Sequence, residues 1–97
     1  MDYSKVVKGI VENVVVADQA FIDSGVLGDP SLFYLTDFYT RGNVHYNHDW
    51  QPDGLPPFRG NYGATGFTWD SVNQVFYAPC PGPNYILDET TWTWVAG

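Results

Sequence analysis

The sequence predicts an all-β fold, a small antiparallel sheet built from hairpins, with one short helix near residues 19–24. Runs of β-branched and aromatic residues, separated by turn-forming Gly, Asn and Asp, recur along the chain. The apolar periodicity of a helix is absent elsewhere in the sequence. Because the 97 residues contain no long linker, we expect a single small domain spanning residues 1–97.

The first half of the chain supplies a hairpin, the helix and further strands. "YSKVVKGIVENVVVAD" predicts two strands, at residues 3–7 and 13–17, with "KGIVE" between them carrying the glycine that a hairpin turn favours. "ADQAFIDSG" offers Asp18 as an N-cap and Gly25 at the C-terminal cap of one or two helical turns. "LFYLTDFYTRGNVHY" predicts one strand, or two joined near Arg41 and Gly42.

The second half begins with an irregular segment. Residues 47–66 hold three prolines and four glycines, and their aromatic residues predict an ordered loop packed on the sheet. Residues 67–95 then contain two aromatic-rich hairpins, "FTWDSVNQVFY" and "YILDETTWTWV", in which Asp70 and Asp88 accept hydrogen bonds from the turn amides. The proline-rich "APCPGP" joins them as a stiff extended segment. We expect Trp69 and Trp92 to be core residues.

Composition excludes several classes of function. With 4 basic and 11 acidic residues the net charge is −7, which repels phosphates and argues against nucleic-acid binding. The apolar runs fall well short of a membrane span, and the start lacks a signal peptide's apolar run, so we expect a soluble protein made in a cytoplasm. Cys80 stands alone, so the fold holds without an internal disulfide.

The residue patterns predict neither an enzyme nor a cofactor or metal site. "HYNHD" places His45, His48 and Asp49 close together, but no further His or usable Cys completes a tetrahedral site. There is no G-x-S-x-G elbow for a nucleophile, and "RGNYGATG" lacks the lysine of a phosphate loop. The adjacent acids Asp88 and Glu89 lie in an expected turn, where capping explains them better than acid catalysis.

The aromatic content exceeds what a core of this size can bury, which predicts an exposed patch that binds a partner. Arg41 and Arg59 precede glycines in aromatic surroundings, and each can either contact a partner or stack on a ring of its own chain. The candidate partner-binding residues are Tyr77, Tyr85, Trp94, Trp50, Arg41 and Arg59.

The blocks "VVVADQAFIDSG", "TRGNVHY", "RGNYGATGFTWD" and "FYAPCPGPNYILDETTWTW" follow one another in the sequence. Their succession, from about Val6 to Trp94, resembles a family of small virion-type structural proteins of tailed bacteriophages that infect cyanobacteria, especially marine ones. The last block also looks like the "P-x-P…W-x-L-D-x-x-T…W" ending of small phage tail-associated proteins, except that Tyr85 stands where a tryptophan is usual.

The resemblance implies a non-enzymatic structural role in the virion, with other virion proteins or a second copy of the chain as partners. We favour a capsid decoration or cement protein on the head exterior. A small neck, tail or fibre component and a tail-fibre assembly chaperone stay open as alternatives. A carbohydrate-binding module that uses exposed tryptophans as stacking platforms is a further alternative.

Overall fold

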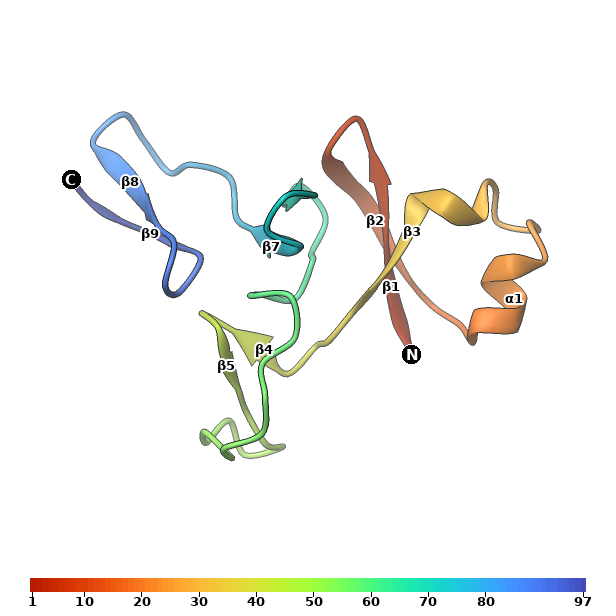
Figure 1. Cartoon of the computed structure of the whole chain (residues 1–97), viewed down its shortest axis with the longest axis horizontal. Coiled ribbons are helices and arrows are strands. Elements are labelled where there is room, and N and C mark those ends of the chain that lie inside the picture. Colours follow the sequence, from red (N-terminus) through yellow and green to blue (C-terminus); the bar gives the residue numbers. More distant parts are fainter.

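A computed structural model describes residues 1–97 and confirms a mostly β fold with one short α-helix and one 3₁₀ turn (Figure 1). Five antiparallel strands form the main sheet in the order β3-β1-β2-β6-β7, and two separate hairpins are β4-β5 and β8-β9. No helix is long and apolar enough to cross a membrane. The elements are β1 (Asp2–Val7), β2 (Ile10–Val16), α1 (Gln19–Asp23), the 3₁₀ turn η1 (Pro30–Leu32), β3 (Phe33–Thr36), β4 (Thr40–Arg41), β5 (Val44–His45), β6 (Thr68–Asp70), β7 (Val75–Tyr77), β8 (Tyr85–Asp88) and β9 (Thr93–Ala96).

The first hairpin is tighter than the sequence predicts. Its turn is Lys8–Gly9 alone, with φ of 53° and 80°, the paired positive values of a type I′ turn. The expected five-residue connection "KGIVE" is therefore wrong, because Gly9 reverses the chain at once and Ile10 already belongs to β2. The register shifts after the Lys5–Asn13 pair, since Val6 pairs with Val11 and leaves one bulged residue in β2.

The helix forms where the sequence predicts it. The Asp18 carboxylate accepts a hydrogen bond of 2.8 Å from the Phe21 amide, and Gly25 follows the helix with a φ of 78°. The helix buries Ile22 against Tyr3 and Phe33. It therefore covers one face of the β1-β3 part of the sheet.

The core consists of two small apolar clusters. One joins Val6, Val11, Trp69 and Phe76, and the other joins Tyr3, Ile22 and Phe33. Tyr3 and Val6 come from the same strand, so β1 contributes to both clusters. Trp69 is 7% exposed, as its predicted core role requires. Trp92 is half-buried, so its predicted core role is met only in part.

The 47–66 loop packs on the sheet through its second half. Gly60, Asn61 and Gly63 are buried, whereas residues 51–57 are exposed. The Ser4 hydroxyl donates a 2.6 Å hydrogen bond to the Gly63 carbonyl, and the Gly63 amide donates one of 2.8 Å to the Thr36 hydroxyl. A Cβ atom at Gly63 would lie 2.5 Å from the Ser4 Oγ, so only glycine allows this close approach.

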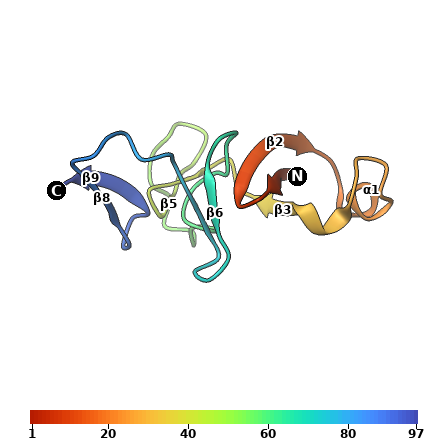
Figure 2. The same cartoon turned by 90° about the horizontal axis from the view of Figure 1, so that it is seen from above.

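The Asn61 side chain joins three parts of the fold. Its Oδ1 accepts from the Gly42 amide at 2.8 Å, and its Nδ2 donates to the carbonyls of Phe76 at 2.9 Å and Trp92 at 2.8 Å. These bonds link the β4-β5 turn, β7 and the β8-β9 turn. The molecule is elongated, 43 × 31 × 20 Å, with the β8-β9 hairpin at one end and α1 at the other (Figures 1 and 2).

Candidate functional site

The β6-β7 and β8-β9 hairpins have the predicted Asp-capped turns. Asp70 accepts from the amides of Val72 at 3.0 Å and Asn73 at 3.1 Å, and Asp88 accepts from the Thr90 amide at 2.8 Å. The side-chain amide of Asn73, followed by its backbone amide, lowers the pKa of Asp70. Each turn therefore carries its own local stabilisation.

The inner side of the β8-β9 hairpin attaches it to the rest of the chain. The Trp94 indole donates a 2.6 Å hydrogen bond to the Ala78 carbonyl, and its ring meets that of Tyr77 edge-on at a centroid distance of 6.0 Å. Leu87 pairs with Trp94 and shares this side of the ladder. Two predicted docking residues, Tyr77 and Trp94, thus contact each other and fix the hairpin, while Tyr85 is exposed near its open end.

The outer side of the hairpin carries an apolar pair that is exposed to solvent. Ile86 and Val95 are directly paired, and they are 59% and 39% exposed. We call this pair the outer hairpin face. Sequence reasoning missed both residues, because alternation along a strand shows that half of the side chains point outward without showing which half.

Arg41 and Trp50, two further candidates, meet in a second exposed group. The Arg41 guanidinium carbon lies 5.0 Å from the ring centre of Phe38, 5.2 Å from that of Tyr62 and 5.4 Å from that of Trp50. We call these three rings the aromatic collar. The Arg41 Nε donates a 3.2 Å hydrogen bond to the Phe38 carbonyl. No ion pair links Arg41 to a carboxylate of the chain.

Trp50 holds an unusual backbone conformation within this group. Its φ is 57°, which is strained for a bulky side chain, and the residue is 44% exposed. The ring also lies 5.5 Å from that of Tyr39 and 6.0 Å from that of Tyr46. Of the four tryptophans, Trp50 alone is exposed.

Arg59, the last candidate, lies apart from both groups and is half-buried. Its guanidinium carbon is 4.9 Å from the Phe58 ring centre and 5.2 Å from that of Trp69, and its Nη1 donates to the Leu35 carbonyl at 2.9 Å. Burial lowers the pKa of Arg59, and the nearby Tyr34 opposes this change. The geometry of Arg59 therefore corresponds to stacking on rings of its own chain.

The two histidines of "HYNHD" have different partners. His45 lies between two carboxylates, with Nδ1 2.8 Å from Asp53 and Nε2 3.2 Å from Asp37, whereas His48 Nδ1 is 3.0 Å from the Tyr39 hydroxyl. Desolvation acts to raise the pKa of Asp53, but the hydrogen bond from His45 and further amide contacts outweigh it and lower that pKa. No group of three His, Cys, Asp or Glu side chains is arranged to hold a metal ion.

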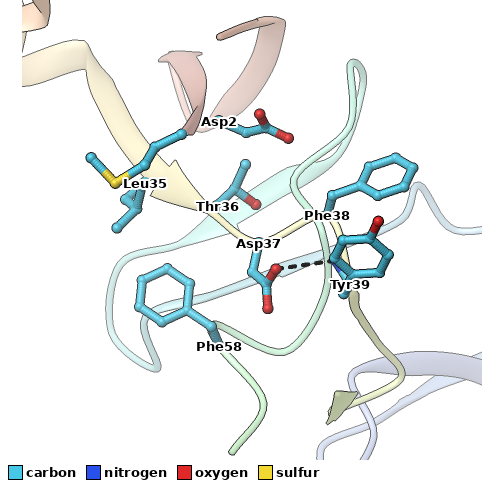
Figure 3. Close-up of a pocket in the computed structure, with 8 residues that line it drawn as sticks. Asp2, Leu35, Thr36, Asp37, Phe38, Tyr39 and Phe58 are labelled. Atoms are coloured by element: carbon cyan, nitrogen blue, oxygen red, sulfur yellow. Dashed lines mark hydrogen bonds between the residues drawn. The ribbon is translucent and has the colours of Figure 1, made fainter. Parts of the chain in front are cut away.

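A shallow cavity of about 390 Å³ lies where β3 ends, with Leu35, Phe38 and Phe58 among its apolar residues (Figure 3). Asp37 also lines it, but its carboxylate accepts from the Tyr39 amide at 3.1 Å and from the Thr40 hydroxyl at 2.8 Å. Those bonds, together with His45, fix the Asp37 carboxylate in a structural role between β3 and β4.

The chain matches no protein-family model, and neither the curated proteins nor the solved structures contain a significant match to it.

Proposed function

We propose that this chain is a non-enzymatic structural protein of a tailed-phage particle, docked on another particle protein through the outer hairpin face. The phage assignment is supported by the four ordered sequence blocks from about Val6 to Trp94. The docking role is supported by one structural observation, the exposed and directly paired Ile86 and Val95.

A two-stranded hairpin is only marginally stable when it stands alone. The β8-β9 hairpin is covered on its inner side by Tyr77 and Ala78, whereas Ile86 and Val95 on its other side stay 59% and 39% exposed. Fully burying one such side chain contributes about 1.5–3 kcal/mol. Because Trp94 and Asn61 already fix the hairpin, a partner meets a preorganised surface and the ordering cost of binding is small.

Charge favours a neutral or basic surface on the partner. Asp88 and Glu89 sit at the turn of a hairpin that has no basic residue, and the whole chain carries a net charge of −7. An acidic partner would be repelled. Since apolar area supplies most of the contact, added salt should weaken docking only moderately.

We place the protein on the capsid exterior, because a small acidic domain suits a shell that repeats one docking site many times. Quantitative mass spectrometry of purified particles tests this placement. Copies on the order of hundreds per particle would support the head, and a small multiple of about three or six would support the neck, tail or fibre. A protein present in infected cells and absent from purified particles would be an assembly chaperone, which would end the structural proposal.

A further inference from the structure

We infer that Arg41 and its aromatic collar form a binding site for an organic carboxylate. The site shares no residue with the outer hairpin face, so each proposal has its own test. Its ligand class is a carboxylate carried on a ring or an apolar group, as in an acidic side chain, an aromatic acid or an acidic sugar.

The guanidinium is held in place but its binding capacity is unused. The contact from Nε to the Phe38 carbonyl is its only hydrogen bond within the chain, so the two terminal nitrogens are free to donate. Three rings within 5.4 Å of the guanidinium carbon restrict the side chain. A planar guanidinium fixed in this way matches the two oxygens of a carboxylate, and little side-chain entropy remains to be lost.

The chain itself leaves this cation without a carboxylate. It has 11 acidic residues, yet none forms an ion pair with Arg41. One competing negative charge is Asp2: burial first and then Asp2 raise the pKa of Tyr62, the collar phenol whose pKa Arg41 lowers. An unpaired, fixed and exposed guanidinium is the arrangement that an incoming carboxylate would complete.

The surroundings of Arg41 favour a carboxylate attached to a ring or apolar group. Phe38 and Trp50 are both exposed large aromatic side chains at the border of the collar. Their ring edges and faces offer stacking area next to the charged centre. A turn closed by the 3.0 Å hydrogen bond from the Trp50 amide to the Asn47 carbonyl holds the Trp50 ring in position.

Titration with benzoate, followed by ¹⁵N NMR, tests the inference. The indole N–H signal of Trp50, assigned with Trp50→Phe, should shift saturably with a dissociation constant on the order of 1–10 mM. Benzamide has the same shape without the charge, and it should bind about tenfold more weakly or not at all. Equal shifts with benzamide, or no saturable shift with benzoate, would overturn the carboxylate site.

Three variants separate the guanidinium from general charge effects. Arg41→Lys keeps the charge but loses the planar donors, and it should weaken benzoate binding about fivefold. Lys8→Asn removes a positive charge from the β1-β2 turn, at a left-handed position that Asn tolerates, and should leave binding unchanged. Asp2→Asn removes the competing charge and should strengthen binding about twofold, a gain that misfolding cannot produce. Unchanged binding in Arg41→Lys would refute the role of Arg41.

Two further ligand pairs identify the source of the carboxylate. Tighter binding of glucuronate than of the α-amide of N-acetylglutamate, which keeps its side-chain carboxylate, would indicate an acidic sugar. The reverse order would indicate an acidic protein side chain. Both outcomes support the inference. Glucose binding as tightly as glucuronate would overturn it, because the site would then recognise a sugar ring without its carboxylate.

Discussion

Ile86 and Val95 lie directly opposite each other across the β8-β9 ladder, and both side chains face solvent. The next pair along the ladder, Leu87 and Trp94, points to the other side, where the Trp94 indole bonds to Ala78. The two sides of one hairpin therefore differ in role. One attaches the hairpin to the molecule, and the other presents an exposed apolar pair.

Gly63→Ala should destabilise the fold by about 1–3 kcal/mol, because a new methyl group would press against two buried side chains. The added Cβ would lie 2.5 Å from the Ser4 Oγ and 2.7 Å from the Phe76 ring. Gly82→Ala is the matched control, since its Cβ would meet only Tyr85, at an ordinary 3.7 Å. Urea unfolding of both variants measures the difference, and equal midpoints would show that the loop does not approach the sheet as described.

Asn61→Ala should cost about 2–4 kcal/mol, because it leaves the Gly42 amide and two carbonyl groups without their partner. The substitution should also loosen the β8-β9 hairpin, because the Trp92 carbonyl in its turn loses the hydrogen bond from the Asn61 side chain. Hydrogen exchange of the amides in β8 and β9 should then accelerate more than that of β1. Asn84→Ala, at an exposed position, serves as the control, and protection unchanged in β8 and β9 of Asn61→Ala would contradict the linking role of Asn61.

Replacing Trp69 with Ala should cost about 3–5 kcal/mol, because the ring fills the core between Tyr34 and Phe76. Trp92→Ala should cost less, about 1–2 kcal/mol, since the ring is only half-buried. Trp92 also has a φ of 57°, so Trp92→Gly should be no less stable than Trp92→Ala despite losing one more carbon. Chemical denaturation ranks the three variants by their free energy of unfolding. A larger loss of stability in Trp92→Ala than in Trp69→Ala would show that Trp92, not Trp69, is the main core tryptophan.

Asp70 should make part of the fold's stability depend on pH. Its pKa is lowered in the folded chain, so its contribution is present above the unfolded pKa of about 4 and is lost as pH falls through the lower folded value. Asp70→Asn should therefore be less stable than the parent at pH 7, by about 1 kcal/mol. The difference should shrink as the solution is acidified from pH 5 to pH 2, and a constant difference across that range would exclude Asp70 as a source of the pH dependence.

Features set by neighbouring residues could be predicted from the sequence. The capped turns at Asp70 and Asp88 and the helix start at Asp18 depend on contacts two or three residues apart, and all three are present. The length of the first hairpin's connection could not be predicted, because the apolar residues after Gly9 fit a strand as well as a connection.

Features set by distant contacts could not be predicted. The pairing of β1 with β3, and the Asn61 bonds to segments 15 to 31 residues away, depend on how the whole chain packs. The six candidate residues lie in different places for the same reason. Packing brings Tyr77 against Trp94 and places Arg41 within the aromatic collar. Sequence composition indicated an excess of aromatic surface but not its location.

The measurement that tests the central proposal most directly is the copy number of hairpin variants on purified phage particles. Ile86→Thr combined with Val95→Thr keeps β-branched side chains in the ladder and removes apolar area from the outer hairpin face. Val72→Thr makes the same change at the β6-β7 turn, at a side chain 89% exposed, and is the matched control. With the folding of all variants confirmed, we expect the double variant to lose at least about tenfold in occupancy, since two apolar contacts are removed, and Val72→Thr to match the parent. Equal occupancy of the double variant and the parent would show that the outer hairpin face is not the docking surface.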